Sequence, residues 1–146
     1  MHWLAERLTT LESCHQRYTH MREARVGSGE VQPSHDEVVA RSGFFTDLTT
    51  LVTEIAERDG VLATFAEHEG LLVATAGDPS AAEALAAMAC SVVVPARRAA
   101  TALELGPLDQ TLIMGRDRKL ALVLVGDLSI GILAPSELRL ASTLKR

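Results

Sequence analysis

Residues 80–104 restrict the fold of this chain more than any other segment, because small apolar side chains lie on nearly every side of it. Ten alanines fall between positions 81 and 102. Ser80 and Glu83 have the spacing of a capping box, and Gly106 followed by Pro107 is a stop signal, so this segment is predicted to be one long helix. A helix that is apolar all round needs burial on more than one side. In a chain of 146 residues, we expect one side to meet a sheet and the other to meet a second copy of the same helix.

The two sides of this helix can be assigned from the spacing of its larger residues. Leu85, Met88 and Val92 recur on one stripe, which we assign to the sheet. Ala89 falls off that stripe and is therefore expected near the seam with the second copy. Pro95 removes a backbone hydrogen bond and clashes with the preceding turn, at a cost of about 3 kcal/mol, so the helix is expected to be kinked or broken there.

The first third of the chain is predicted to be helical. Residues 1–25 show an amphipathic period, and the glycines at 27 and 29 end that helix before a short linker through Pro33. Ser34 and Glu37 form a second capping box, from which a helix runs to about residue 58, with Gly43 as a point where it can divide in two. We therefore separate an N-terminal helix and linker, residues 1–33, from a domain of residues 34–146.

Strands follow from residue 61 onward, where the apolar period changes. Tight turns at 67–70 and 126–127 join neighbouring strands into antiparallel pairs, and a last helix is expected from Pro135. The fold class is therefore α+β, a five-stranded and mainly antiparallel sheet sandwiched between helices, with an extra N-terminal helix. The predicted strands are 61–66, 71–76, 111–114, 120–125 and 128–133.

Composition excludes several classes of function. The net charge is −5 and aromatic residues make up 3% of the chain, which argues against nucleic-acid binding. No apolar run approaches the roughly 20 residues of a membrane span, and Glu6 and Arg7 interrupt any signal-peptide core. Cys14 and Cys90 are far apart and are read as reduced thiols. We expect a cytoplasmic protein that binds neither nucleic acid nor membrane.

The sequence offers little for catalysis or for metal binding. Cys14, His15 and His20 diverge around a helix axis and lack a fourth ligand at a suitable spacing. Cys90 lies in an apolar helical stretch, where thiols are usually inert. No nucleophile elbow, phosphate loop or dinucleotide fingerprint occurs. We predict no catalytic residues, no cofactor, no metal and no enzymatic activity.

The order of elements, together with several local patterns, resembles the roadblock family, the dynein-light-chain-like domain that also occurs in prokaryotic regulators of Ras-like GTPases. The resemblance begins near Asp47 and reaches the end of the chain. Residues 1–45 have no counterpart in the minimal domain, and no matched residue serves as an arginine finger. The patterns that carry the resemblance are residues 48–52, 59–61, 66–74, 104–108, 111–114 and 120–125.

This resemblance implies a small non-enzymatic homodimer whose central helices pair and whose sheets join edge to edge. It implies that the helix 80–104 and the strand 111–114 take part in dimerisation, and that a Ras-like small GTPase is a partner. Arg97 and Arg98 are the candidate contacts to that partner. The candidate residues of the dimer interface are Ala82, Ala86, Ala89, Val93, Ala100 and Leu112.

A second function from a different class stays open. An α+β fold of profilin-like or PAS-like outline can instead enclose a small ligand and act as a sensor. Such a site needs an apolar cavity with a few convergent polar groups. Thr64 and Thr75 are among the few polar candidates for its lining.

Overall fold

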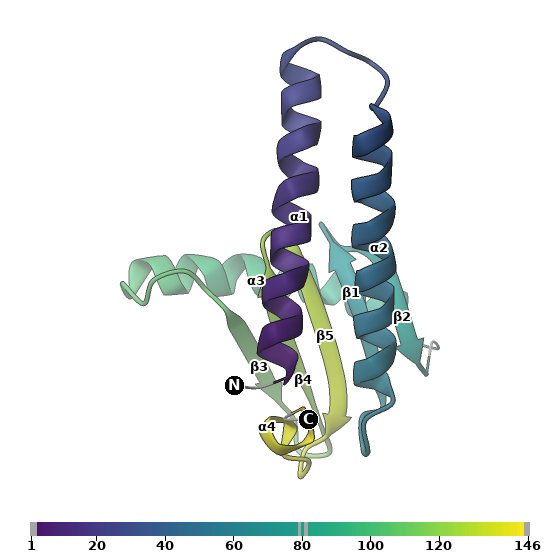
Figure 1. Ribbon diagram of the computed structural model, residues 1–146. Helices are drawn as coiled ribbons and strands as arrows, with labels where there is room; N and C mark the ends of the chain where they lie inside the picture. Colours follow the sequence, from purple (N-terminus) through teal and green to yellow (C-terminus); the bar gives the residue numbers. More distant parts are fainter. Residues whose placement is uncertain (1–2, 79, 81, 145–146) are drawn as a thin grey trace.

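A computed structural model describes residues 3–78, 80 and 82–144 of the chain. It has five strands and four helices within those residues, and Figure 1 shows their arrangement. All pairs of neighbouring strands are antiparallel, and the strand order is β2-β1-β5-β4-β3. The predicted fold class is confirmed. In chain order the elements are α1 (Trp3–Gly27), α2 (His35–Ala56), β1 (Ala63–His68), β2 (Leu71–Gly77), α3 (Ala82–Ala102), β3 (Gln110–Met114), β4 (Arg118–Val125), β5 (Leu128–Pro135) and α4 (Leu140–Thr143).

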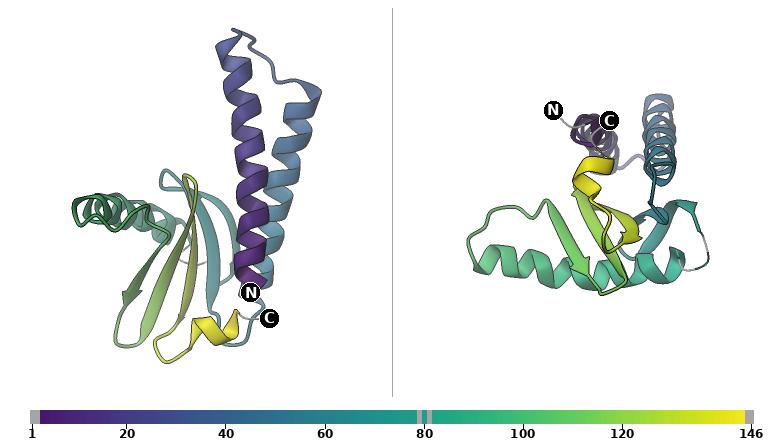
Figure 2. Two further views of the ribbon diagram at one scale, coloured as in Figure 1. Left: turned by 60° about the vertical axis from the view of Figure 1, so that its left-hand side comes forward. Right: turned by 90° about the horizontal axis from the view of Figure 1, so that it is seen from below.

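The helices cover the two faces of the sheet unequally. Helices α1 and α2 form an antiparallel pair on one face, and α3 lies alone on the other (Figure 2). The carboxyl-terminal half of α3 extends past the edge strand β3, as both views of Figure 2 and Figure 1 show. The α1–α2 pair also extends well beyond one end of the sheet (Figure 1).

Each face of the sheet has its own apolar core. Alternate residues of a strand point to opposite faces, so Ala66 of β1 joins the core under α2 while Phe65 joins the core under α3. The α2 core includes Leu48 and Ile55, both fully buried. The α3 core depends on Gly131 of β5, because an added Cβ there would lie 2.2 Å from the Phe65 ring. The glycine thus makes room for the large aromatic side chain between sheet and helix.

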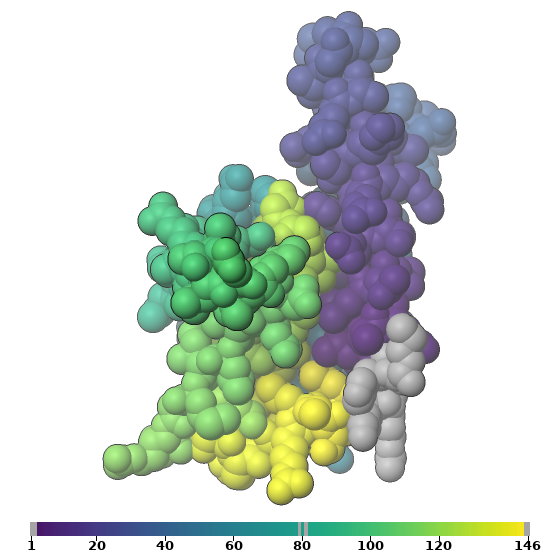
Figure 3. Space-filling model, turned by 90° about the vertical axis from the view of Figure 1, so that its left-hand side faces the viewer, coloured from purple at the N-terminus to yellow at the C-terminus, as the bar shows by residue number. Residues whose placement is uncertain are grey.

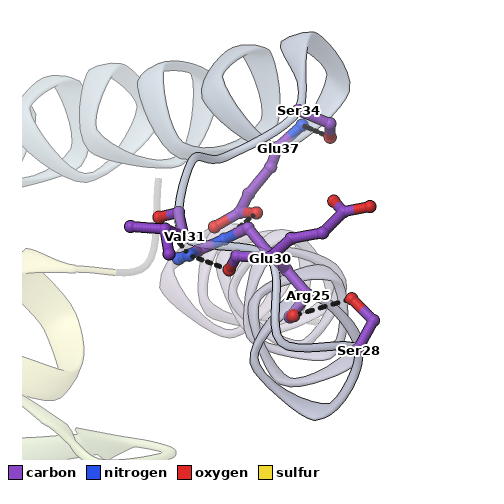
Figure 4. Close-up of polar contacts among 6 residues, drawn as sticks. All are labelled: Arg25, Ser28, Glu30, Val31, Ser34 and Glu37. Carbon is purple, nitrogen blue, oxygen red and sulfur yellow. Dashed lines mark hydrogen bonds and ion pairs between the residues drawn. The ribbon is translucent and has the colours of Figure 1, made fainter.

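The free end of the α1–α2 pair is closed by polar contacts, shown in Figure 4. The Arg25 Nε donates to Oε2 of Glu37 at 2.7 Å, and Glu37 is only 4% exposed. The same guanidinium donates to the carbonyl oxygens of Glu30 and Val31. Ser34 accepts from the Glu37 backbone N–H as the cap of α2. The Glu37 carboxylate therefore pairs with Arg25 of the other helix in place of the expected bond back to the cap.

Neither helix is broken at the position where the sequence allowed a break. Helix α2 runs through Gly43 as one element, and α3 runs through Pro95 as one element. Pro95 lies on the exposed side of α3, so the carbonyl group left without its helical N–H partner faces water and not the core. The capping box expected at Ser80 includes residue 81, which lies outside the described residues.

Two boundaries of the strands also differ from expectation. The hairpin between β1 and β2 turns at Glu69 and Gly70, both with positive φ, so β1 is shifted two residues toward the turn and the turn has two residues in place of the predicted four. Pro135 ends β5 and does not begin a helix, and α4 is a single turn. Pro135 fits there because proline is tolerated at strand ends, where its missing N–H costs no ladder bond.

Candidate interaction surface

The assignment of the two sides of α3 from sequence is wrong in part. Leu85 and Val92 pack against the core under α3 as expected, but Met88 is exposed, and the residues expected at the seam face the chain's own sheet. Ala82, Ala86, Ala89, Val93 and Ala100 are all buried within the single chain. Ala86, Ala89 and Val93 pack with Phe65 and Leu122 of the sheet. Small side chains let the helix backbone approach the sheet closely, which leaves these five residues unavailable to a second copy.

One flank of α3 carries an apolar stripe that is partly exposed, and two of its members, Leu85 and Val92, also pack against the core under α3. Met88 is 64% exposed and Leu103, just past the helix, is 67% exposed. Leu85 and Val92 are half-buried, and Ala99 is exposed. These five recur at helical three- and four-residue steps, so they lie along one side of α3. We call this set, Leu85, Met88, Val92, Ala99 and Leu103, the α3 stripe.

Strand β3 offers a second apolar surface beside the overhanging end of α3. It is the last strand in the sheet, so one row of its backbone N–H and C=O groups has no partner strand within the described chain. Leu112 is 55% exposed, and Ile113 and Met114 are exposed as well. An apolar edge strand without Pro or charged residues favours pairing with another chain.

The α3 stripe and β3 account for much of the exposed apolar surface. Thirteen large hydrophobic side chains are exposed among the described residues, and seven of them belong to α3, β3 or the loop between them. Figure 3 views the molecule from this side, with the end of α3 above β3. Leu112 pairs with Ala121 and so points to the sheet face opposite α3, which places exposed apolar side chains on both faces at the β3 edge. Exposed large apolar side chains gathered on neighbouring elements favour an interaction site. The seven are Met88, Val94, Leu103, Leu105, Leu112, Ile113 and Met114.

The two arginines proposed as partner contacts have different surroundings. Arg97 Nη2 donates to the carbonyl oxygen of Gly126, in the β4–β5 turn, at 3.0 Å. Arg98 is exposed on the side of α3 that faces away from the sheet. Arg98 therefore presents its charge to solvent, while Arg97 ties α3 to the turn.

The β4–β5 turn also joins two histidines. Asp127 lies 3.1 Å from Nε2 of His15 on α1 and 2.8 Å from Nε2 of His68 on β1. Partial burial alone would raise the pKa of the Asp127 carboxyl, but the hydrogen bond from His68 and the charges of both histidines hold it below its usual value. The three residues stabilise the attachment of α1 to the end of the sheet. Sequence gave no sign of this cluster, since His15 and Asp127 are far apart along the chain.

Within residues 3–78, 80 and 82–144, no group of three or more His, Cys, Asp or Glu side chains is arranged to hold a metal ion. Cys14 and Cys90 are both free and half-buried. His15 is engaged with Asp127, whereas His20 is exposed. None of the helices in that same part of the chain is both long enough and apolar enough to span a membrane.

Comparison with known families identifies the fold. Residues 48–134, more than half of the chain, match the model of the Roadblock/LC7 domain. The chain therefore belongs to the Roadblock/LC7 family, as the resemblance in sequence indicated. Helix α1 and the first part of α2 lie outside the matched region. A comparison with curated proteins found no match.

Solved structures share the fold at low sequence identity. The MglB protein of Myxococcus xanthus is 16% identical, with a TM-score of 0.61 over 66% of this chain and 76% of that chain. A Roadblock/LC7 domain from Streptomyces avermitilis is 19% identical, with a TM-score of 0.55 over 61% and 78%. The gliding protein MglB of Thermus thermophilus is 13% identical, with a TM-score of 0.56 over 68% and 76%. At these identities the likeness shows the fold alone.

Proposed function

We propose that this chain is a cytoplasmic, non-enzymatic homodimer that regulates or scaffolds a Ras-like small GTPase. Its membership of the Roadblock/LC7 family supports this proposal. The observation that carries it is the pairing of two apolar surfaces on one side of the molecule, the α3 stripe and the free edge of β3.

The dimer we propose uses these two surfaces together. A second β3 strand beside the first satisfies the unpaired backbone groups and extends the five-stranded sheet. The overhanging half of α3 then reaches the other subunit, and the α3 stripes of the two subunits pack against each other, so that Met88 and Leu103 are removed from water. A two-fold axis makes the interface self-complementary, so each subunit contributes the same residues.

Regulation of the GTPase would need no chemistry from this chain. A protein that binds one nucleotide state of its partner more tightly shifts the partner toward that state by the difference in binding free energy. Arg98, exposed on α3, offers a charged contact to an acidic surface of the partner. The small residues that hold α3 against the sheet keep this face rigid.

The test measures binding of Ras-like small GTPases from the same organism, each loaded with GDP or with a non-hydrolysable GTP analogue. We expect at least one GTPase to bind, with affinities for its two states that differ by about tenfold or more, which corresponds to about 1.4 kcal/mol. Met88→Glu should weaken dimerisation and with it GTPase binding. Val26→Glu replaces a residue of matching exposure, 65% against 64% for Met88, near the free end of α1, and serves as the matched control. Equal affinity for both states, or no binding by any of the GTPases, would contradict the proposal.

A further inference from the structure

A pocket lies on the sheet face opposite α3, where α1 does not reach the last strands. Strands β4 and β5 form the floor of the pocket. The first turns of α1 form one wall, and β3 and α4 form two further walls. Figure 3 faces the side on which α1, β3 and α4 come together. The pocket has a volume of about 660 Å³, within the usual range of small-molecule sites.

The lining of this pocket is aliphatic. Its twelve lining residues comprise ten aliphatic side chains and the uncharged Gln110 and Thr111, so none of them carries a charge. Thr111 is paired with Leu122, which belongs to the core under α3, so its side chain points to the opposite face of the sheet. Gln110, at the start of β3, is therefore the one lining side chain with a hydrogen-bonding group on the pocket side. The leucines that line it are Leu4, Leu8, Leu112, Leu140 and Leu144.

Three alanines from three different elements keep this space open. Ala5 comes from α1, Ala121 from β4 and Ala141 from α4. A larger side chain at any of them would extend into the same volume. Water is a poor occupant, because an ordered water needs two to four polar partners and the lining supplies few. An apolar molecule would gain free energy by covering the leucines, including the exposed Leu112.

We propose that this pocket binds a small uncharged molecule with an aliphatic chain, of the class of a medium-chain alcohol. The aliphatic lining selects the hydrocarbon chain, and none of the lining residues within the described part of the chain carries a charge that would hold a charged head group. Gln110 is placed to hydrogen-bond the single polar group at the mouth. Thr64 and Thr75, the polar residues considered from sequence, are not among its lining residues. All of its described lining residues belong to one chain, so this inference does not depend on the GTPase; because Leu112 also lies at the proposed dimer edge, the variants that test the pocket are placed at Ala5 and Ala121.

The experiment measures displacement of the fluorescent probe N-phenyl-1-naphthylamine by decan-1-ol and by decanoate at pH 8. We expect saturable probe binding at one site per chain, displacement by decan-1-ol, and displacement by decanoate that needs a concentration about tenfold or more higher. Failure of the probe to saturate, or decanoate competing as well as the alcohol, would overturn the proposal.

Variants locate the site. Ala5→Leu fills the pocket from the α1 wall, and Ala121→Leu fills it from the β4 floor. Each should weaken probe binding about tenfold or more. Ala24→Leu makes the same change at an exposed position further along α1 and should leave binding unchanged. Circular dichroism on each variant checks that the fold is retained. If either folded pocket variant binds the probe as the wild type does, the ligand lies elsewhere and the proposal is wrong.

Discussion

Substituting Ala89 with Glu tests which side of α3 faces the sheet. Ala89 is 0% exposed and packs with Phe65, Val93 and Leu122, none of which can pair with a carboxylate. The new side chain must either carry an unpaired charge in the core or stay protonated. Keeping a carboxyl with an ordinary pKa of about 4.3 protonated at pH 7 costs about 4 kcal/mol, since each pH unit contributes about 1.4 kcal/mol. We therefore expect Ala89→Glu to destabilise the subunit itself.

This loss has a thermal signature and a pH signature. For a chain of this size, 4 kcal/mol lowers the melting temperature by roughly 10–15 °C. The buried carboxyl has a raised pKa in the folded state, so its penalty shrinks as the pH falls toward the unfolded value. Between pH 7 and pH 5, about 2.7 kcal/mol of the loss should be recovered.

Thermal unfolding followed by circular dichroism at pH 7 and pH 5 measures both signatures. Ala84→Glu is the matched control, because Ala84 is on the same helix but exposed, and its change should stay within about 0.5 kcal/mol. If Ala89→Glu melts with the wild type at pH 7, or if its deficit is the same at both pH values, the packing of α3 described above is refuted.

Three further substitutions test other contacts. Glu37→Gln leaves the Arg25 guanidinium without its carboxylate and should cost about 3 kcal/mol near the free end of the α1–α2 pair, seen as faster amide hydrogen exchange in residues 22–40. Asp127 has a lowered pKa in the folded state, so its ionised carboxylate stabilises the fold at neutral pH and this stabilisation is lost as the pH falls below 3.8. In urea unfolding, the free energy of unfolding of Asp127→Asn should therefore fall less than that of the wild type between neutral pH and pH 3. Gly131→Ala forces a Cβ onto the Phe65 ring and should lower the free energy of unfolding by about 1–3 kcal/mol, measured by urea titration.

Much of the fold could be predicted because local signals agree with it. The change of apolar period near residue 60, the cap at Ser34 and the turn at Gly126 each correspond to a feature of the structure. The extra N-terminal helix was expected, and its packing against α2 was not. Helix α2 continues through Gly43 because one glycine costs only about 1 kcal/mol, which burial of residues such as Phe44 outweighs.

The interaction surface could be predicted only in part. Leu112 lies on the expected strand and is exposed, and Leu85 and Val92 pack toward the sheet as expected, but Met88 and Ala89 lie on the opposite sides of α3 from those expected. A stripe of large apolar residues and a stripe of small ones both fit the helical period. Which stripe packs on the sheet depends on the size of the side chains that the sheet presents to the helix. Here Phe65, accommodated by Gly131, fills the space between sheet and helix, so the small residues Ala86 and Ala89 lie directly against it and the larger Leu85 and Val92 pack at its margin. The contact of Asp127 with His15 and His68 depends on long-range packing that no local pattern encodes.

Sedimentation equilibrium of the purified chain tests the central claim, that the α3 stripe and the edge of β3 form a homodimer interface. We expect a mass twice the 15.7 kDa of one chain at micromolar concentration. We also expect a shift toward the mass of one chain for Met88→Glu and for Leu112→Asp, with circular dichroism unchanged, because both residues are exposed in the subunit. A mass of 15.7 kDa for the wild type throughout the micromolar range, or variants that remain fully dimeric, would contradict this claim.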